Sequence, residues 1–241
     1  MDSNINDFPI QNAIKENNIN LAKQLILENP KNLYIKDLDD RTPLHWAVSI
    51  NNTELVKFII DLKPEVNIDE YVDLSGWSPL HISSSLGNIE ILNLFMNMSN
   101  PPDINSKTNL GITPLHLSIS KNHLSYVRTL INEYGANYKI KDKKGYTPLI
   151  RASSIGSIPI VQELLAQKNI SVNATDNDGW TSLHHALAEG HGDCAVYLVE
   201  KGGVDFNLTN NEDLKPIQVS VDEKVAKYFK DHVDYKIKEI E

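Results

Sequence analysis

Segments with a one-sided apolar pattern recur along the chain at intervals of 34 to 36 residues. In each segment the apolar residues are spaced so that they fall on one face of a helix. One such helix and a single neighbour cannot bury this face, so successive units are expected to stack on one another. The segments are LVKFII (55–60), ILNLF (91–95), YVRTLI (126–131), IVQELL (160–165) and CAVYLV (194–199).

A second phrase precedes each segment and predicts the start of another helix. Its threonine or serine can accept hydrogen bonds from the exposed N–H groups of the first turn. Its proline suits that turn because the missing N–H has no intrahelical acceptor there. Clear copies are RTPLHWA (41–47), WSPLHIS (77–83), ITPLHLS (112–118), YTPLIRA (146–152) and WTSLHHA (180–186), and degraded copies are FPIQNA (8–13) and LKPIQV (214–219).

The phrase and its period resemble the ankyrin repeat, whose signature is T-P-L-H-x-A. Glycines at 76, 111, 145 and 179 stand where a tight hairpin turn needs a positive φ. Tetratricopeptide repeats have nearly the same period, but their tryptophan-glycine-tyrosine pattern is missing. The resemblance implies an all-α fold, an ankyrin-repeat solenoid of seven helix-turn-helix repeats with short β-hairpin tips.

This register predicts a single ankyrin-repeat domain over residues 1–230 and a charged C-terminal tail over 231–241, which frays or extends the last helix. The first and last repeats are expected to act as polar caps. Phe8 and Lys215 replace their capping threonine, and Asp213 replaces the glycine. The predicted repeats are roughly 3–36, 37–72, 73–107, 108–141, 142–175, 176–209 and 210–230.

The charge distribution points to a protein partner and away from nucleic acid. With 23 basic and 32 acidic side chains the net charge is −9, which is unsuited to neutralising phosphates. Residues 1–120 carry 8 basic and 15 acidic side chains, whereas residues 121–151 carry 7 basic and 2 acidic. Such a division suits a partner with complementary patches, although each charge taken alone is better explained as part of a solvated surface.

The single cysteine, Cys194, excludes an intramolecular disulfide and suits a reducing compartment. Nothing in the sequence reads as a signal peptide or a membrane span. We therefore expect a cytoplasmic and nuclear protein, monomeric when free, with no membrane or nucleic-acid partner.

Eight histidines raise the question of catalysis or metal binding. His45, His81, His116 and His184 occupy the same position in successive repeats, which favours a scaffold role with hydrogen bonds inside the repeat. The cluster of His184, His185 and His191 lacks a recognisable ligand spacing. Cys194 is expected in the core. The sequence therefore predicts no enzyme activity, no cofactor and no metal.

Hairpin tips and first helices form the concave binding surface of an ankyrin solenoid, so unusual residues at those positions are candidates for partner binding. Trp77, Tyr146 and Trp180 share one tip position, and aromatic residues are enriched at binding hot spots. Packing of each ring against the adjacent hairpin remains an alternative. The tip candidates are Asp39, Arg41, Leu74, Ser75, Trp77, Leu110, Ile112, Lys143, Lys144, Tyr146, Asp178 and Trp180, and the first-helix candidates are Lys15, Glu16, Ser49, Leu86, Lys121, Ile155 and Glu189. Trp46 occupies a position usually filled by leucine and is expected in the core.

A closer resemblance, to the gankyrin family and above all to its yeast branch, spans all seven repeats. It is carried by DLDDRTPLHWAVS (37–49), SGWSPLHI (75–82), LHLSISKN (115–122) and HALAEGHGDCAVYLVEKGG (185–203). The resemblance implies an assembly chaperone of the proteasome regulatory particle, whose concave face binds the C-terminal domain of a base ATPase subunit and sterically regulates docking on the core particle. The retinoblastoma-binding L-x-C-x-E motif of animal members is absent, because 185–189 reads HALAE.

The same resemblance implies that Arg41 and Lys121 pair with acidic side chains of the ATPase subunit. Arginine can do so bidentately. Reversing both charges is expected to weaken binding strongly with little change in the thermal melt. The alternative is an ankyrin adaptor for a different protein, such as a signalling or transcription factor. Recovery of base ATPases from cell extract would distinguish the two.

Overall fold

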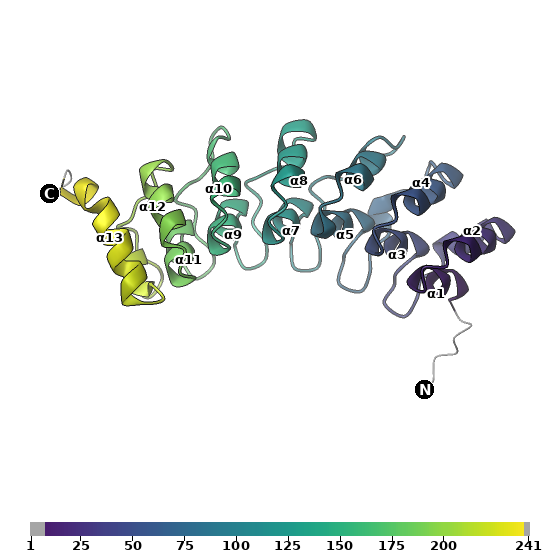
Figure 1. Cartoon of the computed structure of the whole chain (residues 1–241), viewed down its shortest axis with the longest axis horizontal. Helices are drawn as coiled ribbons and strands as arrows, with labels where there is room; N and C mark the ends of the chain where they lie inside the picture. Colours follow the sequence, from purple (N-terminus) through teal and green to yellow (C-terminus); the bar gives the residue numbers. More distant parts are fainter. Residues whose placement is uncertain (1–7, 239–241) are drawn as a thin grey trace. The chain divides into compact units, whose positions relative to one another are not determined.

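The structure is a computed structural model that describes residues 8–238 and forms two compact units, Met1–Leu117 and Ser118–Glu241. Each unit is built from successive helix pairs joined by tight tips (Figure 1). The expected ankyrin-repeat architecture is confirmed. Organisation as one domain over residues 1–230 stays a prediction.

The first unit stacks its helices pair on pair. Helix α1 packs on α2 and α3, α3 packs on α4 and α5, and α5 packs on α6. Their facing sides bury aliphatic residues and Phe95, as the one-sided pattern predicts. The elements are α1 (Pro9–Lys15), α2 (Ile19–Glu28), η1 (Pro30–Tyr34), α3 (Pro43–Ser49), α4 (Thr53–Leu62), η2 (Ile68–Glu70), α5 (Pro79–Leu86) and α6 (Ile89–Met96).

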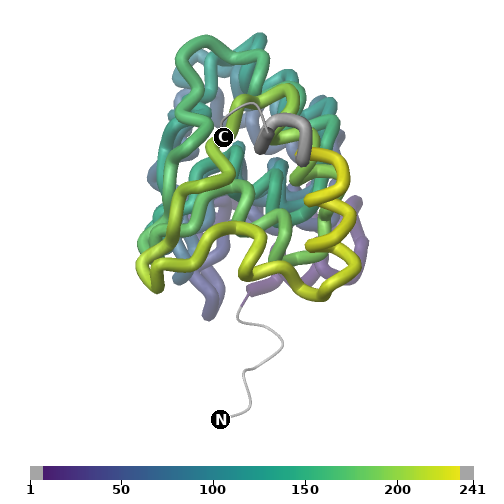
Figure 2. The backbone as a smooth tube through the Cα atoms, turned by 90° about the vertical axis from the view of Figure 1, so that its left-hand side faces the viewer, coloured from purple at the N-terminus to yellow at the C-terminus, as the bar shows by residue number. Residues whose placement is uncertain are grey.

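The second unit continues the pattern. Helix α9 packs on α10 and α11, α11 on α12, and α12 on α13, which is yellow in Figure 2. Helix α7 (Pro114–Ser120) contains the last residues of the first unit and the first of the second. The other elements are α8 (Leu124–Arg128), the π-helical turn η3 (Thr129–Glu133), α9 (Pro148–Ser154), α10 (Ile158–Leu165), α11 (Ser182–Ala188), α12 (Gly192–Glu200), η4 (Pro216–Val219) and α13 (Glu223–Lys238).

The predicted tail is helical where the structure describes it. Helix α13 crosses residue 230 without a break and continues to Lys238. Of the two expectations for the tail, fraying or extension of the last helix, the structure therefore shows extension. The final residues of the predicted tail, 239–241, lie outside the described part. Phe229 and Val233 are buried on this helix, so its apolar face belongs to the core of the second unit.

The repeated histidines occupy the first turns of the first helices. In α3, His45 Nδ1 accepts the backbone N–H of Thr42 at 3.1 Å, and its Nε2–H donates to the carbonyl of Trp77 in the next repeat at 3.1 Å. His184 repeats this arrangement with Leu214, whereas His81 reaches the carbonyl of Ser106, just before the next tip. The scaffold role expected for these histidines is confirmed.

The tips are turns, without the paired strands that a β-hairpin contains. Across residues 8–238 no strand forms, and an isolated bridge joins Thr175 and Thr181. Two backbone hydrogen bonds close each turn. In the second tip the N–H of Asp73 donates to the carbonyl of Trp77 at 2.9 Å, and the N–H of Gly76 donates to the carbonyl of Asp73 at 2.8 Å. The five residues of a tip leave no length for a longer ladder, so side chains must complete its hydrogen bonding.

Candidate functional site

A buried aspartate organises most of the tips. Asp73 shows the pattern: its Oδ1 accepts the backbone N–H groups of Ser75 and Trp77, each at 2.9 Å. Asp37, Asp142 and Asp176 do the same in their own tips, while the hydroxyl of Thr108 and the amide oxygen of Asn210 replace the carboxylate. One carboxylate oxygen thus fixes the backbone that carries the candidate contact residues.

The second oxygen of each aspartate binds a side chain from a first helix or a neighbouring tip. Asp142 Oδ2 accepts from Arg151 Nη2 at 2.8 Å, and Asp176 Oδ2 lies 2.8 Å from His185 Nε2. Asp37 Oδ2 accepts from Trp46 Nε1 at 2.7 Å. These three partners lie nine residues after their aspartate, so one position of the first helix serves the tip in three repeats.

Trp46 is not a core residue, and the expectation that it packs between helices was wrong. Its ring is half-buried, with Lys15 Nζ 4.0 Å from the ring centroid and the Arg41 guanidinium 5.4 Å away. Hydrogen bonding to Asp37 holds the indole toward the tip, because a buried carboxylate requires donors. Lys15 also lies 3.6 Å from Asp37 Oδ2.

Asp37 remains ionised in this setting. Burial raises its pKa, but the N–H groups of Arg41 and Asp39, the Trp46 indole and the Lys15 charge together bring the pKa below its usual value. The site therefore places two cations and one anion around one aromatic ring.

Arg41 is engaged within its own unit. Its Nε and Nη2 both donate to Asp73 Oδ2, at 3.2 and 3.0 Å, and Asp73 is buried. Glutamate at position 41 would place a second carboxylate beside Asp73. For Arg41 this pairing revises the sequence-based expectation, because charge reversal there should lower the thermal melt as well as weaken binding.

The second unit has a matching cluster around Tyr146. The Arg151 guanidinium lies over the Tyr146 ring, 4.8 Å from its centroid, and the His185 ring packs edge-on with its centroid also 4.8 Å away. Trp180 contacts His185 at 5.2 Å between ring centroids. Burial raises the pKa of Tyr146, with a further contribution from Asp176. The tip rings thus rest on the first helices yet remain half-exposed.

All of the predicted contact residues are accessible to solvent. Leu74 and Leu110 are each 63% exposed, which is high for leucine and suits a contact surface. Among the described residues Lys121 forms no hydrogen bond or ion pair, so its charge is available to a partner. The other exposed candidates are Glu16, Asp39, Ser75, Leu86, Lys143, Lys144, Asp178 and Glu189, and the half-buried ones are Ser49, Trp77, Ile112, Ile155 and Trp180.

The sequence interpretation missed the residues that hold this surface in place, namely Asp73, Asp142, Asp176, Arg151 and His185. A signal for the aspartates was present, because aspartate, threonine or asparagine recurs six residues before each proline position, at 37, 73, 108, 142, 176 and 210. Their partners have no such signal, since tryptophan, arginine and histidine share only the ability to donate.

Cys194 is the single cysteine of the chain. Cys194 is fully buried, and burial raises the pKa of its thiol to about 12, which confirms it as a core residue. Among the side chains that the structure describes, no group of three or more histidine, cysteine, aspartate or glutamate residues is placed to hold a metal ion. In the described part of the chain no helix has the length and apolar character to span a membrane.

Comparison with known proteins connects this surface to a family. The family model "Ankyrin repeats (3 copies)" matches residues 10–108, 94–176, 134–210 and 160–238. The ankyrin repeat domain of Bcl-3 superposes with a TM-score of 0.74 and 25% identity, over 93% of this chain and 99% of that domain.

Curated relatives include proteasome subunits. The probable 26S proteasome regulatory subunit p28 of Saccharomyces cerevisiae is 41% identical over 139 residues, 58% of this chain and 60% of the relative. An ankyrin repeat-containing protein of Schizosaccharomyces pombe is 36% identical over 50% of this chain and 51% of its own length. Mouse 26S proteasome non-ATPase regulatory subunit 10 is 35% identical over 32% of each chain. The aligned part thus spans less than two thirds of each relative.

The similarity to proteasome-associated ankyrin proteins expected from the sequence is confirmed. Overlapping family matches extend over residues 10–238, and the capped first helices, glycine turns and stacked helix pairs agree with them. This chain belongs to the ankyrin-repeat family.

Proposed function

We propose that this protein is a proteasome-associated ankyrin adaptor that assists assembly of the regulatory particle. The observation that carries the proposal is the 41% identity to the yeast proteasome regulatory subunit p28. The specific partner proposed is the C-terminal domain of a base ATPase subunit. Its binding would block premature docking on the core particle by steric exclusion, a mechanism that needs neither a catalytic residue nor a cofactor. We propose that this happens in cytoplasm and nucleus.

The tip and first-helix surface supports this role through its chemistry. In the first unit it offers the exposed Leu74 and Leu110. In the second unit it offers the rings of Tyr146 and Trp180, which rest on side chains that are paired with buried aspartates. Rings fixed in this way lose little side-chain entropy when a partner covers them, which favours affinity. Lys121, Lys143 and Lys144 give the second unit exposed positive charge, whereas Asp39 and Glu16 add negative charge in the first. A partner with the complementary order would bind in one register.

Arg41 is proposed to contact an acidic side chain of the partner while it remains bonded to Asp73. Two of its nitrogens are used within the chain, and Nη1 makes no hydrogen bond among the described residues. Asp73 therefore fixes the guanidinium plane before binding. This lowers the ordering cost of the contact and makes arginine irreplaceable by lysine at this position.

Affinity purification tests the function: the tagged full chain serves as bait, and bound proteins are recovered from yeast extract at low salt. We expect base ATPase subunits of the regulatory particle among the proteins recovered. Recovery of a different protein set without any base ATPase would instead support the alternative adaptor role.

The contact residues are tested with variants that respect the Asp73 pairing. We expect Lys121→Glu to weaken ATPase binding about tenfold or more with an unchanged melt, because Lys121 has no partner within the described chain. Arg41→Gln combined with Asp73→Asn removes the cation without leaving a buried unpaired carboxylate, and it should weaken binding to a similar extent.

Asp73→Asn alone is the matched control for the double variant. Isothermal titration calorimetry with the ATPase C-terminal domain supplies the dissociation constants. Binding that is equal for wild type and both charge variants would contradict the proposed contacts.

A further inference from the structure

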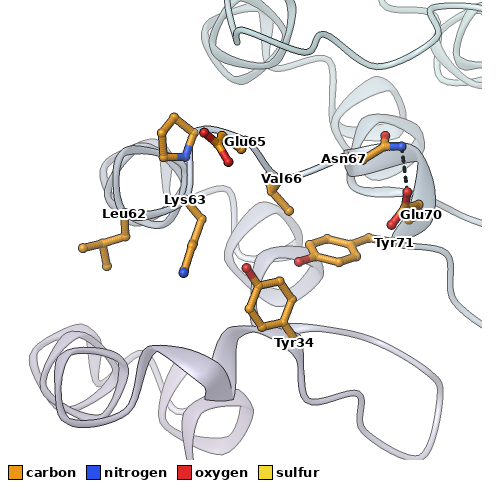
Figure 3. Close-up of a pocket in the computed structure, with 9 residues that line it drawn as sticks. Tyr34, Leu62, Lys63, Glu65, Val66, Asn67, Glu70 and Tyr71 are labelled. Atoms are coloured by element: carbon orange, nitrogen blue, oxygen red, sulfur yellow. Dashed lines mark hydrogen bonds between the residues drawn. The ribbon is translucent and has the colours of Figure 1, made fainter.

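A polar groove lies away from the tips, where repeats one and two end. It has a volume of about 560 Å³ and lies between η1, the end of α4 and η2 (Figure 3). Its walls come from Tyr34, from the segment 62–67, and from Glu70 and Tyr71. These segments follow the second helices, whereas the proposed ATPase contacts lie on tips and first helices. The groove is therefore a separate surface of the first unit.

Three hydrogen-bond donors face the same part of this groove. In Figure 3 the hydroxyl groups of Tyr34 and Tyr71 point into a common space, and the Lys63 ammonium group reaches toward Tyr34. The two tyrosine rings pack edge to face with centroids 6.3 Å apart, and Lys63 Nζ lies 6.0 Å from the Tyr34 centroid. Among the described residues none of these three groups makes a hydrogen bond.

The protonation of these groups makes the groove a donor site. Burial raises the pKa of Tyr71, and the neighbouring Tyr34 and Glu70 raise it further, so its phenol keeps its proton at neutral pH. Lys63 supplies a full positive charge. Because Lys63 already occupies the approach to the Tyr34 ring, a second cation would be repelled. An anion would be met by one ion pair and two hydroxyl donors.

We propose that this groove binds one anionic group, a carboxylate or a phosphoryl group, carried on a peptide segment of a partner protein. A peptide is favoured because the volume exceeds that of a single anion and because Leu62, Pro64 and Val66 add apolar walls for flanking residues. Glu65 and Glu70 also line the groove, and the Oε1 of Glu70 accepts from Asn67 at 3.1 Å. Their charge limits the site to a single anion and excludes polyanions.

The test uses the ¹⁵N-labelled full chain and three blocked peptides, Gly-Leu-X-Val-Gly, where X is phosphoserine, glutamate or glutamine. We expect shifts of the backbone amide signals of residues 63–71 with an anionic peptide and weak or no shifts with the glutamine peptide. Saturation with phosphoserine alone assigns a phosphoryl ligand. Saturation with the glutamate peptide assigns a carboxylate. Equal shifts with all three peptides, or none with any, would overturn the proposal.

Variants test the assigned roles without disturbing the core, since Tyr34 and Lys63 are accessible. Lys63→Gln and Tyr34→Phe should each lower the affinity for the anionic peptide about tenfold. Glu65→Gln should raise the affinity for the anionic peptide, because it removes a charge that repels the anion. Lys107→Gln is the control, as Lys107 is an exposed lysine outside the groove lining. An unchanged affinity in Lys63→Gln, or equal losses in Lys63→Gln and Lys107→Gln, would also overturn the proposal.

Discussion

At the scale of single residues, adjacent tips are joined by asparagines that donate two hydrogen bonds, one from the side chain and one from the backbone. The amide side chain of Asn177 donates to the carbonyl of Lys143 at 2.8 Å, while its backbone N–H donates to Lys144 at 3.1 Å. Asn109 and Asn211 reach the preceding tip in the same way. Each of these asparagines lies close to a glycine of the preceding tip, namely Gly76, Gly145 or Gly179, where an added Cβ would clash with it.

Gly145 provides the clearest test of this contact. Its φ is +83°, and a Cβ there would lie 2.6 Å from Asn177 Oδ1 and 2.7 Å from Asn177 N. We expect Gly145→Ala to lower the free energy of unfolding by about 1–3 kcal/mol from backbone strain, and further because Asn177 must move. Urea denaturation followed by circular dichroism measures this loss.

Gly135→Ala is the matched control, because Gly135 has a φ of +67° and no atom within 4 Å of its would-be Cβ. It should show the strain alone. Equal losses in the two variants would mean that the tip-to-tip contact adds nothing to stability.

At the scale of the element, several first helices are held at their start by a histidine. In α3 and α5 the histidine at the third helical position completes a capping box with the residue before the proline. The other ring nitrogen of His45 reaches the carbonyl of Trp77 in the next tip, and that of His81 reaches the carbonyl of Ser106, just before the next tip. Burial lowers the pKa of His45 and of His81 to about 4, so both rings are neutral in the folded state at pH 7.

The stability of the first unit should therefore fall in mild acid. Between pH about 6.5 and about 4 these histidines are protonated in the unfolded chain but stay neutral in the folded chain. Their contribution to the free energy of unfolding is therefore fully present above this range and is lost as the pH falls through it. By pH 5.5 the loss is on the order of 1 kcal/mol for each histidine. Urea denaturation at pH 7 and 5.5 measures it.

A His45→Gln variant is the control, since glutamine also completes a capping box but does not titrate. Its stability should depend less on pH than that of the wild type. Identical pH profiles would show that His45 takes no part in the acid sensitivity.

Much of this element structure follows from the sequence, and the exceptions have physical causes. The proline register places the starts of α3, α5, α7 and α9 because capping and proline geometry are local. The π-helical turn at 129–133 was not predicted, since a one-residue change in hydrogen-bond register leaves the apolar pattern intact. The bonding of Arg41 to Asp73 and of Trp46 to Asp37 depends on side-chain conformations across a tip, which residue types alone do not specify.

At the scale of the whole molecule, we expect the uneven charge distribution to set the rate at which a partner associates. The net charge of −9 combines acidic stretches over residues 1–120 and 152–241 with a basic stretch over 121–151. Exposed charges act over about 10 Å at 0.1 M salt, so they steer approach more than they hold the complex.

Salt should therefore slow association with the ATPase domain and leave dissociation nearly unchanged. Raising NaCl from about 50 to about 300 mM is expected to lower the association rate constant about tenfold, because screening removes the long-range attraction. Surface plasmon resonance separates the two rates. A salt effect confined to dissociation would assign the charges to short-range contacts instead.

The three tryptophans of the chain, Trp46, Trp77 and Trp180, all lie on tips or first helices, and each has a polar or charged neighbour beside its ring. Lys15 lies over Trp46, while Trp77 and Trp180 contact histidine rings. Tryptophan fluorescence of the unmodified protein therefore comes from the tips and first helices, the elements that carry the proposed contact residues. Covering these elements will alter the emission, so the arrival and departure of a partner can be followed optically without a dye.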